Sequence, residues 1–108
     1  MPEFIFNTTV LSNFAAAGRL DMLAERYRGL AFTTIAVVQQ LETVDASGWL
    51  RILAPESAVE HRLRSEFDLS LDPGEASCVA LAISRGLTFV TDDLAARRQA
   101  EARREVAK

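Results

Sequence analysis

The sequence predicts a three-layer α/β domain, with a central parallel sheet of about four strands and helices on both faces. Short apolar runs alternate with longer helical patterns along the chain, and this alternation is typical of βαβ units. Glycine and proline mark the points where one element ends and the next begins. The last apolar run, residues 87–91, is followed by two adjacent carboxylates, Asp92 and Asp93. In a parallel sheet, this position is the edge where ligands bind.

The first strand is predicted at residues 3–6, where the run Phe-Ile-Phe is typical of a strand buried on both faces. The Asn-Thr-Thr run at residues 7–9 supplies side-chain oxygens that favour a helix N-terminus. Gly18 ends this helix. Residues 19–27 are expected to form a second short helix, because their apolar side chains recur at spacings of three and four.

The second strand is predicted at residues 30–33, an apolar run that ends in two threonines. Thr33 or Thr34 can cap a helix that is expected to run to about Val44. Residues 49–53 alternate only partly between apolar and polar side chains, but they precede a proline. We therefore interpret them as a third short strand.

The second half of the chain continues the alternation with an amphipathic, charged helix at residues 57–67. Pro73 lies in the first turn of the next helix, a position that tolerates proline, and Gly86 ends that helix. Residues 87–91 form the fourth strand and residues 93–108 a charged helix. Because such a helix normally leads to a further strand, we expect a sheet that lacks its final C-terminal strand, or an edge covered by a partner chain.

The composition limits the class of protein. With 108 residues, the chain has room for one domain that spans residues 1–108, and its net charge of −3 means that any basic surface is local. The single cysteine, Cys78, lies in an apolar helical pattern and suits a buried thiol in a reducing compartment. The sequence contains neither a signal-peptide pattern nor an apolar segment of the ~20 residues that a membrane helix needs. A soluble, cytoplasmic protein with no membrane partner is expected.

Polar side chains are predicted to meet where the strands end. Asn7 follows the first strand, Asp92 and Asp93 follow the fourth, and Glu75 opens the helix before it. Gln40 lies about two turns into the helix after the second strand. Clustered carboxylates repel one another, so such a group usually holds a cation. Zinc is excluded because the cysteines or second histidine of a zinc site are missing.

Two segments carry a resemblance to a known family. FIFNTTVLSNFAAAGRLDML at residues 4–23 and GEASCVALAISRGLTFVTDDLAARRQA at residues 74–100 resemble the PIN-domain family, which includes the VapC-like toxins. The resemblance implies a metal-dependent endoribonuclease that acts on single-stranded RNA and holds Mg²⁺ or Mn²⁺ with four acids. It also implies an antitoxin protein as a possible partner, and a homo-oligomer.

Two of the four acids implied by the resemblance are present. Glu75 matches the third acid and Asp92 or Asp93 the fourth. Neighbouring side chains in a strand point to opposite faces, so we expect one aspartate to bind metal and the other to cap the final helix. Thr9 and Ser12 match small hydroxyl positions near the first acid.

The other two positions depart from the family pattern, because Asn7 stands at the first acid and Gln40 at the second. Three interpretations of Asn7 remain open at this point. The first is an engineered inactivation, and the second is a natural change in a family member that binds RNA without cutting it. In the third, a neighbouring acid (Glu42, Asp45 or Asp72) supplies the charge missing at position 7. The sequence thus predicts an endoribonuclease impaired by two amides, or alternatively a non-catalytic module that binds RNA or a protein such as an antitoxin.

The densest basic group lies in the last predicted helix and includes Arg97 and Arg98. It is either a solvated helix face, in which Arg97 pairs with Glu101 four residues later, or a contact for RNA phosphates beside the acidic crevice. His61 lies in a charged helix and is expected to face solvent.

Overall fold

The computed structural model describes residues 2–41 and 49–91. Strands and helices follow one another in the predicted order. In chain order they are β1 (Phe4–Phe6), α1 (Thr8–Ala16), α2 (Leu20–Arg26), β2 (Ala31–Thr34), α3 (Ile35–Gln40), β3 (Leu50–Leu53), α4 (Ala58–Phe67), α5 (Pro73–Arg85) and β4 (Thr88–Val90).

The four strands form one parallel sheet in the order β3-β2-β1-β4. Phe4 of β1 pairs with Ala31 of β2 on one side and with Thr88 of β4 on the other. The predicted parallel α/β sheet is therefore confirmed. Its first strand is central, and Ile5 and Phe6 are fully buried.

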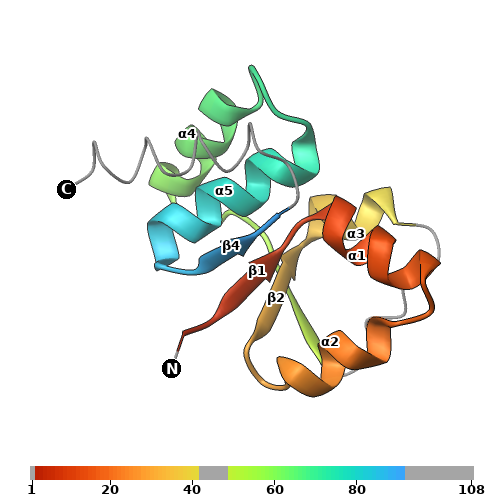
Figure 1. Cartoon of the computed structure of the whole chain (residues 1–108). Coiled ribbons are helices and arrows are strands. Elements are labelled where there is room, and N and C mark those ends of the chain that lie inside the picture. Colours follow the sequence, from red (N-terminus) through yellow and green to blue (C-terminus); the bar gives the residue numbers. More distant parts are fainter. Residues whose placement is uncertain (1, 42–48, 92–108) are drawn as a thin grey trace.

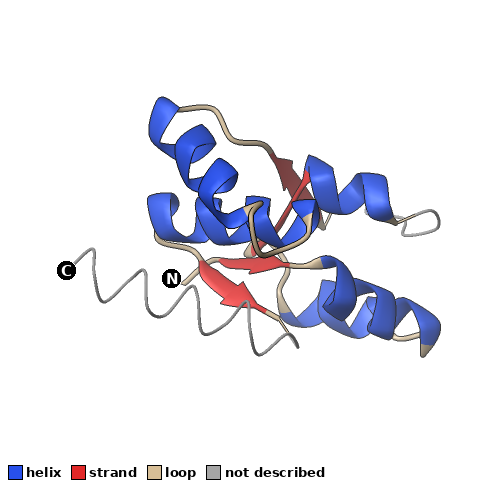
Figure 2. Cartoon of the chain, turned by 90° about the horizontal axis from the view of Figure 1, so that it is seen from above, coloured by secondary structure: helices blue, strands red, loops and turns tan. Residues whose placement is uncertain are grey.

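Helices cover both faces of this sheet, as predicted. Figures 1 and 2 show α4 and α5 on one face, with α1 and α2 on the other. The chain first proceeds from β1 to β2 and β3, then crosses back over the sheet to β4. Because such crossovers are right-handed, the reversal of direction puts the later helices on the opposite face.

Helix α5 lies at the centre of the packing. All nine residues from Gly74 to Ala82 are buried, because the helix contacts β1, β2 and β4 as well as α3 and α4. This burial explains why its sequence is almost continuously small or apolar. Cys78 is fully buried, as predicted.

Side-chain caps define the start of four helices. The capping residues accept a hydrogen bond from a backbone N–H three residues later, and they are Asn7, Thr34, Ser57 and Asp72. Each cap satisfies an N–H that the helix itself leaves without a partner. At the other end of α5, Gly86 adopts the left-handed conformation (φ 68°) that ends the helix.

The predicted extent of α3 is wrong. The helix ends at Gln40 and not near Val44, because the backbone of Leu41 is extended (φ −106°, ψ 112°). From this conformation the Leu41 side chain packs against the main core. Residues 42–48 and the predicted helix at 93–108 lie outside the described residues. No helix in the described part of the chain is long and apolar enough to cross a membrane.

One charged cluster joins α4 to α5. The buried carboxylate of Glu60 accepts hydrogen bonds from Arg85 Nε (2.8 Å) and Ser84 Oγ (2.8 Å). It also accepts from the backbone N–H groups of Glu56 and Ser57 at the start of α4. These donors, Arg85 above all, hold the pKa of Glu60 well below its ordinary value of 4.5. The ionised form is therefore the one that the fold stabilises.

We predict that Glu60→Gln lowers the free energy of unfolding at pH 7 by about 2 kcal/mol, because it removes charged hydrogen bonds at a buried site. Urea denaturation measures this loss. Glu25→Gln, at an exposed position of α2, is the control and should change stability by less than about 0.5 kcal/mol.

The same pair of variants gives the pH dependence of this cluster. A depressed pKa stabilises the fold above the ordinary value of 4.5, and this stabilisation is lost as the pH falls below it. The loss of unfolding free energy caused by Glu60→Gln should therefore have its full size above pH ~5 and become smaller as the pH is lowered. An equal loss from both substitutions would contradict the assigned role.

Candidate functional site at the carboxyl edge of the sheet

The strands β1, β2 and β4 end at one edge of the sheet, with a polar residue at each end. Asn7 follows β1, Thr34 ends β2 and Thr91 follows β4, and all three are buried. This is the edge at which parallel sheets bind ligands. Buried polar side chains therefore lie at this edge, and Asn7 is the one of these three that the sequence predicted for the site.

The side chain of Asn7 is fully buried, and both ends of its amide are engaged. Its Oδ1 accepts a hydrogen bond from the N–H of Val10 (3.1 Å), and its Nδ2 donates to the hydroxyl of Thr91 (2.7 Å). Because the Val10 N–H is a donor, it fixes which end of the amide carries the oxygen. Asn7 thus caps α1 and ties the start of this helix to the end of β4.

A second contact joins the starts of α1 and α5 to the end of α3. The hydroxyl of Thr8 donates to Oε1 of Gln40 (2.5 Å). Gly74 lies against this pair, since a Cβ placed on it would collide with the Gln40 amide and come within 2.9 Å of the Thr8 hydroxyl. The glycine therefore allows the three helix ends to approach one another closely.

Glu75 follows Gly74 in the first turn of α5 and is 5% exposed. Its backbone N–H donates to Oδ1 of Asp72 (2.9 Å), the cap of this helix. The partial positive charge of a helix N-terminus favours an ionised carboxylate at this position. Glu75 is thus a buried acid at the same edge as Asn7 and beside the Thr8–Gln40 contact.

Beneath these residues, a hydroxyl network holds the strand ends to α5. Thr33 Oγ1 donates to the carbonyl of Phe6 (2.8 Å), and Ser77 Oγ donates to the carbonyl of Gly74 (2.8 Å). The hydroxyls of Thr34 and Ser77 also lie 2.6 Å apart. These bonds satisfy buried polar groups and fix the position of the α5 N-terminus relative to the sheet.

Cys78 contributes no reactive group to this edge. Its thiol faces the carbonyl of Phe6 (3.5 Å), and burial raises its pKa to about 12. A thiol with so high a pKa is a poor nucleophile at neutral pH.

The hydroxyl residues predicted for the site, Thr9 and Ser12, both lie on α1. Thr9 is exposed and Ser12 half-buried, whereas Thr8, which the sequence reasoning used only as a candidate helix cap, contacts Gln40. One signal could have indicated this contact, namely the position of Thr8 in the first turn after the strand. His61 is exposed, as expected.

Of the three acids considered as substitutes for a charge at position 7, the structure describes one. Asp72 is exposed and caps α5, so its carboxylate has a structural role there. Glu42 and Asp45 lie outside the described residues. The same holds for four predicted site residues, namely Asp92, Asp93, Arg97 and Arg98.

The described residues do not by themselves fit a tight divalent-metal site. Within residues 2–41 and 49–91, no three histidine, cysteine, aspartate or glutamate side chains gather closely enough to hold a metal ion. Among the described residues, Glu75 is the buried carboxylate at the edge, and positions 7 and 40 present neutral amides. Mg²⁺ and similar hard cations prefer anionic oxygen ligands.

We predict that Gly74→Ala displaces the Gln40 side chain from Thr8 while it changes the free energy of unfolding by less than about 1 kcal/mol. The blocking atoms are the ends of two side chains, which can turn away. The side-chain amide resonances of Gln40 in an NMR spectrum report the displacement. A loss of several kcal/mol would contradict this account and show that the backbone itself must move.

Comparison with protein families gives one match. A family model described as a PIN domain (DUF3368) matches residues 3–104. No curated protein and no solved structure shows significant similarity to the chain. The family match covers all four strands and the edge at which Asn7, Gln40 and Glu75 lie. The chain therefore belongs to the PIN-domain family.

Proposed function

We propose that this chain is a PIN-like endoribonuclease of the VapC-toxin type, acting on single-stranded RNA, whose metal affinity is reduced by Asn7 and Gln40. The observation that carries the proposal is the convergence of Asn7, Gln40 and Glu75 at one edge of a parallel sheet in a PIN domain. Mg²⁺ or Mn²⁺ is the proposed cofactor, and Asp92 or Asp93 the proposed second carboxylate beside Glu75.

Electrostatic energies support a reduced affinity of this site for divalent metal ions. Two unit charges 4 Å apart near a protein surface interact with an energy on the order of 4 kcal/mol. Replacing two carboxylates by amides keeps the oxygen atoms but removes this attraction. The affinity for a divalent cation is therefore expected to fall by several powers of ten.

The fold can accommodate an acid at each amide position. Asparagine and aspartate cap helices about equally well, so an aspartate at position 7 can still accept from the Val10 N–H. The Thr91 hydroxyl, which now accepts from Asn7, can instead turn and donate to a carboxylate. At position 40, a glutamate can accept the hydrogen bond that Thr8 donates to Gln40.

A non-catalytic module that binds RNA or an antitoxin protein is the second candidate. The observation that favours it is that both polar ends of the Asn7 amide serve the fold. Position 7 then contributes to stability without any need for metal. In this alternative, Thr9, Ser12, Arg97 and Arg98 contribute to binding alone.

We predict that the double substitution Asn7→Asp with Gln40→Glu raises Mn²⁺-dependent cleavage of a 5′-labelled single-stranded RNA at least about tenfold over the present sequence. The physical reason is the restored charge at the metal site. Cleavage should stop when EDTA removes the metal.

The control for site specificity is a third substitution in the restored background. Glu75→Gln should return cleavage to the level of the present sequence, whereas Glu25→Gln, at an exposed position of α2, should not. If the restored chain is folded, binds Mn²⁺ and still fails to cleave, the endoribonuclease proposal is overturned and the binding module is favoured.

A further inference from the structure

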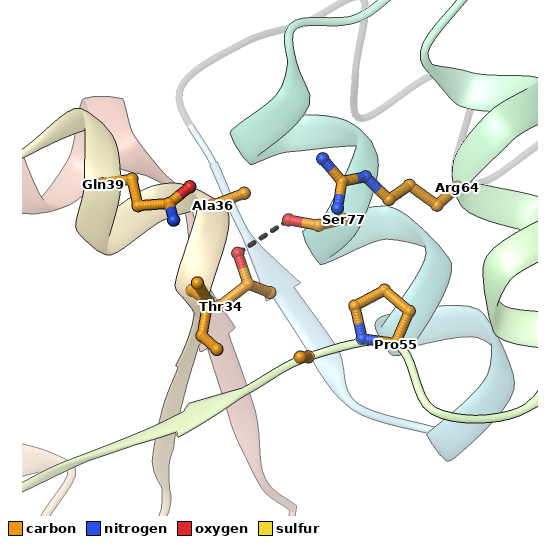
Figure 3. A pocket seen from close by; sticks show the side chains of 8 residues that line it. Thr34, Ala36, Gln39, Pro55, Arg64 and Ser77 are labelled. Carbon is orange, nitrogen blue, oxygen red and sulfur yellow. Dashed lines mark hydrogen bonds between the residues drawn. The ribbon is translucent and has the colours of Figure 1, made fainter.

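A pocket of about 230 Å³ lies beside the carboxyl edge, between the end of β2, the start of α3 and the facing parts of α4 and α5. Figure 3 shows Arg64 reaching from α4 toward Ser77 of α5, with Gln39 of α3 on the opposite side and Pro55 below. Pockets for drug-sized ligands hold roughly 300–1,000 Å³. The space is therefore suited to one small ligand or one unit of a chain.

The pocket has a basic side chain in its lining, although the chain as a whole carries −3. Arg64 is the one ionised side chain among the described residues that line the pocket. Its Nε lies 3.6 Å from Oδ2 of Asp68, one turn further along α4, and the Arg64 side chain is 33% exposed. This surface ion pair is weak, and the guanidinium retains donors that suit a phosphate.

The rim of the pocket is apolar. Ile35, at the start of α3, is 47% exposed. With Pro55 it gives the pocket an apolar wall. Such a wall can contact the face of a nucleobase, and the nearby Gln39 amide can both donate to and accept from a base edge.

The floor of the pocket is fixed in place. The hydroxyls of Thr34 and Ser77 contact each other, and each is also bonded to the backbone, at Val37 N–H and Gly74 carbonyl respectively. Since these hydroxyls are already engaged, recognition rests on Arg64 and the rim. The bond from Ser77 to Gly74 also connects the pocket floor to the edge at which Glu75 lies.

We propose that this pocket binds one nucleotide, with its phosphate on the guanidinium of Arg64 and its base against Ile35 and Pro55. The nucleotide is either free or one unit of an RNA strand that crosses the carboxyl edge. The proposal concerns binding alone and does not depend on RNA hydrolysis.

The first test measures binding of uridine 5′-monophosphate by NMR titration, with EDTA present so that metal plays no part. Arg64→Gln should weaken binding at least about tenfold. The matched control is Arg62→Gln, which removes the same charge from the same helix at an exposed position outside the pocket lining. Equal affinities for the Arg64→Gln and Arg62→Gln variants would overturn the proposal.

Two further variants test the assigned contacts. Asp68→Asn frees Arg64 from its ion pair and should raise the affinity several-fold. Ile35→Ala should weaken binding of the mononucleotide but leave binding of inorganic phosphate unchanged, because only the former carries a base. An equal effect on both ligands, or none on either, would contradict the base contact.

The source of the nucleotide is distinguished by repeating the titration with a single-stranded hexauridylate. Tighter Arg64-dependent binding of the hexamer identifies a unit of an RNA strand as the ligand, and equal binding identifies the free mononucleotide. Arg64-dependent binding in a chain with Asn7→Asp and Gln40→Glu that binds Mn²⁺ but does not cleave RNA would overturn the proposed hydrolysis alone. If cleavage is restored but Arg64→Gln leaves nucleotide binding unchanged, only this inference is overturned.

Discussion

The amide of Asn7 is the contact on which the candidate site depends. It is fully buried and joins the end of β1, the first turn of α1 and the residue that follows β4. Because β1 is central in the sheet, this one side chain fixes where two of the four strands end relative to a helix start. The position of Thr91, immediately before Asp92 in the sequence, is thereby set by Asn7.

At position 7, the stability of the fold and the binding of a metal ion require different side chains. A neutral amide at a fully buried position avoids the desolvation cost of a carboxylate, and it satisfies both of its hydrogen-bonding ends. A carboxylate at position 7 would need a cation to offset that cost, so metal binding would stabilise its fold by linkage. At the neighbouring position, the exposed amide of Gln40 accepts a hydrogen bond from the hydroxyl of Thr8. The present sequence therefore favours a fold that holds its edge together without metal.

Local signals in the sequence were sufficient for the fold. The caps Asn7 and Thr34, the stop at Gly86 and the four apolar runs each act within a few residues, and the structure confirms them. Contacts between distant segments were not predictable in this way. The approach of Gly74 to Thr8 and Gln40 depends on how three helices pack, and so does the bond between Glu60 and Arg85. The end of α3 at Gln40 was missed for the same reason, since the packing of Leu41 against the core decides it.

The central claim is that two neutral amides weaken a divalent-metal site in an otherwise intact PIN-domain edge. Isothermal titration calorimetry with Mn²⁺ tests it most directly, on the present chain and on the chain with Asn7→Asp and Gln40→Glu. The account predicts that the substituted chain binds Mn²⁺ at least about a hundredfold more tightly, from the restored charge. Equal affinities in two folded chains would contradict the claim and remove positions 7 and 40 from the metal site.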